Sequence, residues 1–163
     1  MNREEVFETL KIDEGVEYQI YLDHLGYPTF GVGHLVTDND PEAGLEVGTG
    51  ISNERVWEAF ESDLDTSVAE CQVLFPGGAF DDFPEEVQQV VVNMMFNMGR
   101  PRLSKFKKML AGLESGDFKT AALEGRDSKW YNQAERKKVR LDDNEKKLNY
   151  EKIDISSLRR KEI

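Results

Sequence analysis

The chain has 163 residues, in which 21 Lys and Arg stand against 32 Asp and Glu, giving a formal net charge of −11. This length predicts one domain, or two small lobes that share a core. The acidic balance argues against nucleic-acid binding, which needs a basic surface, and against electrostatic docking on anionic membranes. The single cysteine, Cys71, leaves no internal disulfide and no zinc-ligand pattern.

The sequence also contains no stretch that predicts a targeting or membrane-spanning segment. No apolar run of signal-peptide length follows Met1, and the most apolar stretch, residues 90–98, is too short to span a bilayer. We therefore expect synthesis in a cytoplasm, no signal peptide and no membrane insertion.

The first third of the chain changes from helical to strand-like periodicity. Asn2 and Glu5 resemble a capping box, and apolar residues at helical spacing predict a helix over about 3–13, which Gly15 ends. Apolar and polar residues then alternate with a period of two, which predicts a small antiparallel meander over about 17–36.

The middle of the chain reads as a loop followed by two helices. Residues 37–50 are rich in Asp and Gly, and Ser52 can cap a helix whose apolar stripe runs from Val56 to Cys71. Residues 87–98 are apolar on nearly every face, which predicts a buried central helix that the Gly-Arg-Pro of residues 99–101 ends.

The last third becomes harder to interpret. Apolar spacing from Leu103 to Leu113 predicts another helix that closes near Gly116, and Asp117 can cap a short one after it. Charged residues dominate 135–152, where we still expect helix although the apolar spacing is poor. Basic residues gather in three places: Lys105, Lys107 and Lys108; residues 136–138; and residues 159–161.

This order of elements predicts an α+β fold in a single domain over 1–163. A small β-meander lobe takes about residues 14–58, and a larger helical lobe takes about residues 59–163 together with the helix at 3–13. A long helix joins the two lobes. A cleft between unequal lobes is a natural place for a ligand.

Three polar residues near the N-terminus suggest hydrolytic chemistry. Glu14 falls at the end of the first helix, Asp23 at the end of the first strand, and Thr29 on the next strand. Glycoside hydrolysis needs one protonated carboxyl and one ionised carboxylate across the scissile bond. In a chain this acidic, such a pair taken alone is more often solvated surface, and spacing alone could equally favour Asp13.

The surrounding residues resemble the active-site segment of the T-even phage lysozymes. The shared pattern is Glu-Gly, then Tyr-x-Asp-x-x-Gly-Tyr-x-Thr-x-Gly-x-Gly-His-Leu, carried here by DEG at 13–15 and YLDHLGYPTFGVGHL at 21–35. As one string it is highly specific. The resemblance covers about residues 1–133 and continues in NMMFNMG at 93–99, in the helix of Phe106 and in DSKWYNQ at 127–133.

The resemblance implies catalytic roles for those three residues. Glu14 matches the general acid, Asp23 the second carboxylate, and Thr29 the residue that holds the hydrolytic water. An inverting outcome is expected on this basis, and no metal or organic cofactor is required. Asp13 matches no catalytic residue and is expected to pair with a basic residue near the C-terminus.

Supporting and substrate-binding roles also follow from the resemblance. His34 matches a structural histidine that pairs with an acidic residue near the lobe junction. A cation is expected against Glu14: Arg136 if the alignment has a one-residue gap, or Lys137 if it has none. The expected cleft or hinge residues are Leu35, Phe96, Phe106 and Asn132.

The implied activity is that of a lysozyme, an endo-acting N-acetylmuramidase that cleaves the β-1,4 bond between N-acetylmuramic acid and N-acetylglucosamine of bacterial peptidoglycan. In phage-mediated lysis, the protein would be made in the host cytoplasm. It would act in the periplasm or cell wall, after holin release or delivery in a virion. A monomer is expected.

Two departures keep an alternative open, a non-catalytic lysozyme-like module that binds peptidoglycan or belongs to a tail baseplate. The resemblance ends after about Val139, where Tyr150, Ile153, Ile155 and Leu158 could substitute for the usual closing helix, and the surface is acidic rather than basic. A faint calcium-loop pattern at Asp38, Asp40 and Glu42 lacks the required Gly and Glu, so an acidic loop is favoured.

Overall fold

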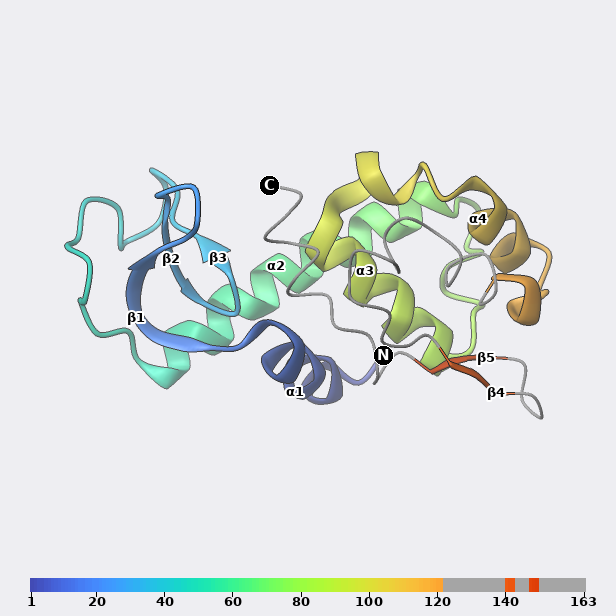
Figure 1. Cartoon of the computed structure of the whole chain (residues 1–163), viewed down its shortest axis with the longest axis horizontal. Helices are drawn as coiled ribbons and strands as arrows, with labels where there is room; N and C mark the ends of the chain where they lie inside the picture. Colours follow the sequence, from blue (N-terminus) through green and yellow to red (C-terminus); the bar gives the residue numbers. More distant parts are fainter. Residues whose placement is uncertain (122–139, 143–146, 150–163) are drawn as a thin grey trace.

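The computed structural model describes residues 1–121, 140–142 and 147–149. A small sheet lies at one end of the molecule and most helices at the other, with α2 running between them (Figure 1). The elements are, in chain order, α1 (Arg3–Glu14), β1 (Glu17–Leu22), β2 (Pro28–Gly31), β3 (His34–Leu35), α2 (Asn53–Leu74), α3 (Glu85–Leu103), α4 (Lys107–Glu114), β4 (Arg140–Asp142) and β5 (Lys147–Asn149). The α+β prediction, with a small meander and a long connecting helix, is confirmed.

Helix α1 begins and ends where its capping residues predict. The Asn2 side chain accepts a hydrogen bond from the Glu5 amide at 3.1 Å, and Gly15 adopts a φ of 80° just after the last helical residue. The capping box is only half formed, because the Asn2 amide donates to Glu85 at 2.7 Å instead of to Glu5. Glu5 accepts from Gln89 at 2.9 Å, so both contacts tie α1 to α3.

The sheet is antiparallel in the order β1-β2-β3, as the alternating pattern predicts. Its first pairing shifts register between Glu17 and Tyr21, an irregularity that bends a strand, and β1 curves visibly as it leaves α1 (Figure 1). The end of the following loop pairs along the other side of β1, where the Ile20 amide donates to Thr49 at 2.9 Å. The loop is therefore anchored to the sheet at its far end.

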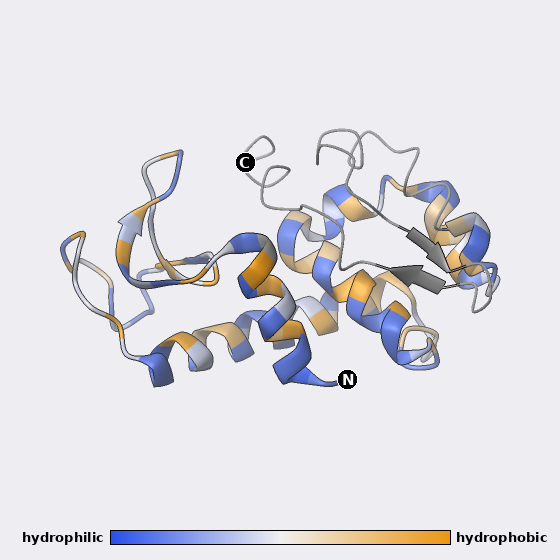
Figure 2. Cartoon of the chain, turned by 60° about the horizontal axis from the view of Figure 1, so that its bottom comes forward, coloured by the Kyte–Doolittle hydropathy of each residue, from blue (hydrophilic) through white to orange (hydrophobic). Residues whose placement is uncertain are grey.

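Helix α2 contributes to two hydrophobic cores and so joins the lobes. Ser52 caps it by accepting from the Arg55 amide at 3.1 Å. Its first turns place Val56 and Ala59 in a small core under the sheet, while later turns place Phe60 and Leu64 in the larger helical core. Apolar stripes alternate with polar faces along the helices in Figure 2, as expected for helices that are buried on one side.

Helix α3 is the buried central helix of the larger lobe, and its C-terminal end differs from the prediction. Gly99 breaks it with φ 78° and ψ 164°, but a helical turn resumes and includes Pro101, so the helix reaches Leu103. Proline is tolerated there because it sits in the first turn after the break, where its missing amide costs no helical hydrogen bond. The next helix therefore begins at Lys107 rather than at Leu103.

The prediction of helix over 135–152 is wrong for the residues that the structure describes there. β4 and β5 form an antiparallel pair in which Leu141 lies opposite Leu148. Apolar residues whose spacing does not suit a helix can still face one another across a pair of antiparallel strands. Residues 122–139, 143–146 and 150–163 lie outside the description. Within the described residues, no helix is long and apolar enough to cross a membrane.

Candidate active site

Glu14 is the last residue of α1 and lies half-buried where the helix gives way to the sheet. Gly15 makes this sharp change of direction possible, because its φ of 80° is strained for residues that carry a side chain. Two residues later the curved strand β1 begins, and Asp23 directly follows the end of that strand. A bent strand brings its two ends closer together than a straight strand of the same length would.

Asp23 organises the turn between β1 and β2. One carboxylate oxygen, Oδ1, accepts hydrogen bonds from the amides of Leu25 and Tyr27, both at 2.9 Å. The Asp23 amide in turn donates to the Tyr27 carbonyl at 2.9 Å. Asn and Asp commonly hold turns in this way. The carboxylate is thus fixed relative to the backbone of the hairpin.

Thr29 lies on β2 and is only 2% exposed. Its hydroxyl donates to the Tyr27 carbonyl at 2.9 Å. Because the Tyr27 amide also donates to Asp23, one residue of the turn holds both polar side chains. A hydroxyl that donates its proton to a carbonyl still has lone pairs with which to accept another hydrogen bond.

The residues expected to bind substrate divide between the lobes. Leu35 is 42% exposed and lies opposite Thr29 in the β2–β3 pairing. Phe96 and Phe106 are half-buried against the helical core, with the Phe96 ring centroid 5.7 Å from that of Phe60. Asn132, Arg136 and Lys137 lie outside the described residues, as does the side chain of Asp13.

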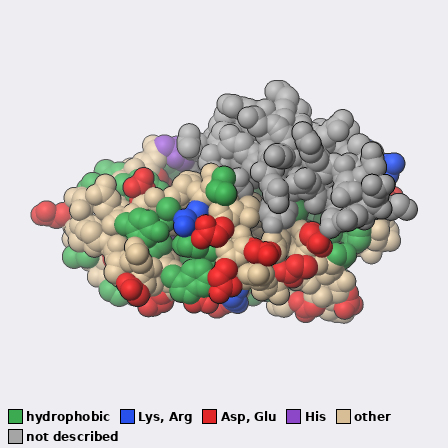
Figure 3. Space-filling model, turned by 90° about the horizontal axis from the view of Figure 1, so that it is seen from below, with side chains coloured by type: hydrophobic (Ala, Val, Ile, Leu, Met, Phe, Trp, Pro, Cys, Tyr) green, Lys and Arg blue, Asp and Glu red, His purple; other side chains and the backbone are tan. Residues whose placement is uncertain are grey.

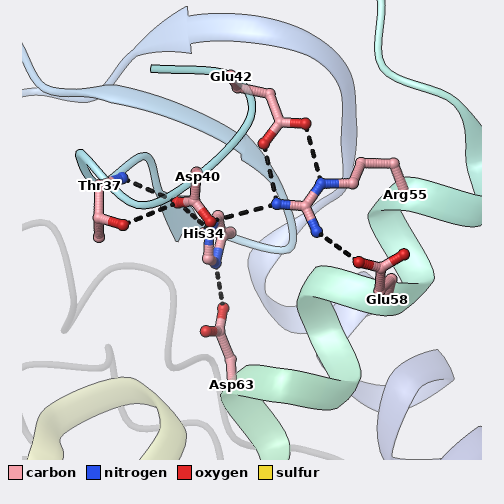
Figure 4. Close-up of polar contacts among 7 residues, drawn as sticks. All are labelled: His34, Thr37, Asp40, Glu42, Arg55, Glu58 and Asp63. Carbon is pink, nitrogen blue, oxygen red and sulfur yellow. Dashed lines mark hydrogen bonds and ion pairs between the residues drawn. The ribbon is translucent and has the colours of Figure 1, made fainter.

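His34 lies between two carboxylates from different elements (Figure 4). Its Nδ1 is 2.8 Å from Asp63 of α2, and its Nε2 is 2.9 Å from Asp40 of the following loop. Both partners are acceptors, so the ring can donate to both only when it carries a proton on each nitrogen. Burial alone lowers the pKa of His34, but hydrogen bonds to Asp63 and Asp40 and their negative charges outweigh it and raise the pKa above its usual value.

Arg55 of α2 is the centre of the same network, and the sequence did not single it out. Its guanidinium binds Glu42 through Nε and Nη2, both at 2.9 Å, and reaches Asp40 at 3.2 Å and Glu58 at 3.1 Å. Charge-assisted bidentate pairs of this kind are strong and geometrically specific. The two acidic residues of the loop therefore lock it onto α2. Among the described residues, no cluster of His, Cys, Asp and Glu could hold a metal ion.

The network also lowers the pKa values of Glu42 and Asp40 and raises the pKa of Arg55. Hydrogen bonding to Arg55 lowers the pKa of Glu42 below its usual value, and Glu42 correspondingly raises the pKa of Arg55. Burial opposes ionisation of Asp40, but hydrogen bonds from Thr37 and His34 lower its pKa overall. All these groups are stabilised in their charged forms, which suits a structural ion-pair network rather than acid–base chemistry.

Comparison with known proteins identifies the family of this sequence. A sequence profile described as phage lysozyme matches residues 11–143, which include the end of α1, the sheet, α2, α3 and α4. The chain belongs to the phage lysozyme family. This confirms the resemblance carried by the motif, and with it the lysozyme type of glycoside hydrolase.

Two kinds of known protein are similar to this chain in sequence. The chain is 31% identical over 151 residues to the pre-baseplate central spike protein Gp5 of Enterobacteria phage T4, covering 82% of this chain but only 26% of Gp5. It is 28% identical over 149 residues to each of the probable T4-type lysozymes 1 and 2 of Dictyostelium discoideum, covering 81% of this chain and 88% of each relative. The chain thus spans about a quarter of the length of the spike protein and most of the length of the two lysozymes.

Proposed function

We propose that this chain is an endo-acting muramidase that cleaves the β-1,4 bond between N-acetylmuramic acid and N-acetylglucosamine in bacterial peptidoglycan. Glu14 protonates the glycosidic oxygen as the general acid. Asp23 and Thr29 position a water molecule on the opposite face of the sugar, so that the anomeric configuration inverts. No metal or organic cofactor takes part, and the protein acts as a monomer.

The observation that carries this proposal is the shared attachment of Asp23 and Thr29 to Tyr27. Both hydrogen bonds are 2.9 Å long and both belong to one tight turn, so the carboxylate and the hydroxyl keep a fixed relative position. The Thr29 oxygen can accept a hydrogen bond from water, and an ionised Asp23 can take a proton from it. Preorganised groups of this kind are what a water-activating site requires.

The position of Glu14 supports its role as the acid. It is half-buried at the junction of α1 and the sheet, whereas Glu17 three residues later is exposed on β1. A positioned carboxyl that is partly shielded from solvent suits proton donation to a leaving oxygen.

The similarity to Gp5 favours a second candidate function. Gp5 is a spike protein, so this chain could be a lysozyme-like baseplate module that binds peptidoglycan without cleaving it. Under the first function the protein reaches the periplasm after holin release or virion delivery. Under the second it arrives only as part of a virion.

The deciding experiment measures loss of turbidity of chloroform-treated Gram-negative cells with the wild type, Glu14→Gln and Glu17→Gln. We expect clearing by the wild type and by the control Glu17→Gln, whose side chain is exposed. The rate for Glu14→Gln should be at least 100-fold lower, because general acid catalysis contributes about 10²–10⁴-fold.

A separate measurement tests inversion: NMR identifies the anomer that is formed first when soluble peptidoglycan fragments are cleaved. Equal clearing by Glu14→Gln would exclude Glu14 as the acid, and sedimentation with sacculi without clearing by any variant would favour the binding module.

A further inference from the structure

The turn that holds Asp23 is a hairpin loop made of residues 24–26. Asp23 and Tyr27 face each other across it, because the Asp23 amide donates to the Tyr27 carbonyl at 2.9 Å. The Gly26 amide donates to the Asp23 carbonyl at 2.9 Å, which closes a β-turn, and Gly26 itself has a φ of 87°. A β-turn followed by one left-handed residue is a common way to build a hairpin loop of this length.

Asp23 differs from an ordinary surface carboxylate in how it is held. Acidic side chains are spread over the face of the molecule shown in Figure 3, and a free side chain of this kind samples several rotamers. In the hairpin, the consecutive amides of residues 25, 26 and 27 all donate to Asp23. The first and third bind the side-chain oxygen Oδ1, and the second binds the main-chain carbonyl. The backbone of the loop therefore fixes the direction of this carboxylate.

These contacts leave one oxygen of Asp23 for chemistry. Oδ1 uses both of its lone pairs on the amides of Leu25 and Tyr27, whereas Oδ2 accepts no hydrogen bond from any residue that the structure describes. In the proposed reaction, a water oxygen bonds to the anomeric carbon, a proton of that water passes to Asp23, and the leaving oxygen takes the proton of Glu14. Oδ2 is the oxygen that can take the proton from water.

The backbone conformation of Gly26 determines where the last of the three amides points. A φ of 87° lies in the left-handed region, which glycine enters at no steric cost and other residues disfavour. A Cβ atom added to Gly26 would meet no atom within 4 Å. A side chain here would therefore be penalised by the backbone conformation alone. Relief of that strain would rotate the next peptide, which carries the Tyr27 amide.

We infer that Gly26 is a positioning residue for the water-activating pair, Asp23 and Thr29. The inference rests on the proposed function and extends it to a residue without a side chain. The conformation of Gly26 directs the Tyr27 amide to Asp23, and the Tyr27 carbonyl accepts from the Thr29 hydroxyl, both at 2.9 Å. One glycine thus sets the relative position of the carboxylate and the hydroxyl. A displacement of about 1 Å at a reacting group can cost about 100-fold in rate.

The test compares three single substitutions in the full chain. Gly26→Ala introduces backbone strain without a steric clash. Gly26→Asn is the conservative variant, because asparagine tolerates the left-handed region better than other side chains. Gly44→Ala is the matched control: Gly44 is also exposed, has a φ of 81° and has no atom within 4 Å of an added Cβ, but it lies in the loop between β3 and α2.

Thermal melts establish that the variants fold and should show similar losses of Tm in the two alanine variants, since both carry the same kind of strain. On soluble peptidoglycan fragments, Gly26→Ala should lower kcat by about 10- to 100-fold and change KM by less than about threefold, because the reacting groups move while the contacts to the sugars stay. Gly26→Asn should recover kcat to within about threefold of the wild type. Gly44→Ala should leave kcat unchanged.

Hydrogen exchange measured by NMR follows the same contact without catalysis. The amides of Leu25 and Tyr27 should exchange faster in Gly26→Ala than in the wild type, because their hydrogen bonds to Asp23 are weakened. Neither amide should change in Gly44→Ala, and both should be close to the wild type in Gly26→Asn.

Three results would overturn the inference: a Gly26→Ala variant with the kcat of the wild type, equal losses of kcat in the two alanine variants, or no recovery with asparagine. If the wild type hydrolyses no fragment, the proposed function fails. The exchange comparison then decides whether Gly26 holds the loop amides on Asp23, because faster exchange in Gly26→Ala alone would support that contact and unchanged exchange would contradict it.

Discussion

His34 shows how single residues connect the loop, the sheet and α2 in this protein. Its ring lies between Asp63 and Asp40, and Asp40 also accepts from the Thr37 amide at 2.8 Å and from Arg55. The ring of Phe30 lies beside it at a centroid distance of 5.0 Å, next to Thr29 in the chain. A change in the charge of His34 therefore alters the surroundings of β2, the strand that carries Thr29.

The pH dependence of stability should reveal this arrangement. Since the pKa of His34 is raised in the folded state, its stabilising contribution is complete below its unfolded pKa of about 6.5 and is lost as the pH rises through the folded value. We expect His34→Asn to lower the free energy of unfolding by about 1–3 kcal/mol at pH 6 and by less at pH 9. Urea unfolding at the two pH values measures this difference.

The other histidine provides the matched control. His24 is exposed in the turn after β1, so His24→Asn should change the free energy of unfolding by less than about 0.5 kcal/mol at either pH. A cost of His34→Asn that is the same at pH 6 and pH 9 would show that the contribution is packing and not the charge of the ring.

At the residue scale, a motif in the sequence points to Glu14, Asp23 and Thr29 as site residues, whereas long-range contacts leave no such signal. Asp23 and Thr29 lie in the second segment of that motif, and the structure shows that both bind Tyr27 in one turn. Nothing in the sequence singled out Arg55, because its partner Glu42 lies 13 residues away in an irregular loop. A lone arginine in an acidic helix is a weak signal, since such residues are usually solvated.

At the scale of elements, the contact between α4 and the helical turn at 118–121 depends on Gly112. A Cβ atom at this position would lie 2.9 Å from the Ala121 amide nitrogen and 3.1 Å from the Asp117 carbonyl oxygen. Both are backbone atoms, which cannot move aside as a flexible side chain can. The close approach is secured by a hydrogen bond from the Asp117 amide to Gly112 at 2.8 Å.

Gly112→Ala should therefore destabilise the protein although alanine is the better helix former. The intrinsic gain of about 1 kcal/mol is outweighed by overlap that typically costs about 1–3 kcal/mol, so we expect a net loss of about 1 kcal/mol in the free energy of unfolding. Gly50→Ala is the control, because no atom lies within 4 Å of its added Cβ and its φ is not positive. A Gly112→Ala variant as stable as the wild type would contradict the close contact.

Element boundaries were predictable where capping residues fix them and not where glycine and proline act together. Ser52 and Gly15 mark helix ends in the sequence and in the structure alike. Gly99 and Pro101 indicate the end of a helix, yet the structure uses Gly99 as a break and Pro101 in the next turn. Local signals cannot distinguish these outcomes, because packing of Leu103 into the core decides that the helical turn resumes.

At the scale of the whole molecule, α2 joins the two lobes into one structure. Its stripe of apolar residues was visible in the sequence, but its division between two cores was not. Val56 packs with Ile20 and Phe30 under the sheet, whereas Leu64 packs in the helical core. The division follows from where the sheet ends along the helix, and therefore from tertiary contacts that a helical period does not encode.

The net charge of −11 leads to a prediction for the whole molecule. Like charges on a compact surface repel one another, and salt screens this repulsion: the Debye length falls from about 30 Å at 0.01 M to about 10 Å at 0.1 M. We expect the Tm to rise by about 3–5 °C over this range of NaCl, equivalent to about 1 kcal/mol. Differential scanning calorimetry measures the change.

A charge-reduced variant tests whether repulsion is the cause. Glu17, Asp38 and Glu46 are exposed, so Glu17→Gln/Asp38→Asn/Glu46→Gln removes three negative charges and brings the net charge from −11 to −8. Its Tm in 0.01 M NaCl should lie above that of the wild type, and its gain on adding salt should be smaller, since less repulsion remains to be screened. An equal salt response in both proteins would mean that NaCl acts through preferential hydration and not through the acidic surface.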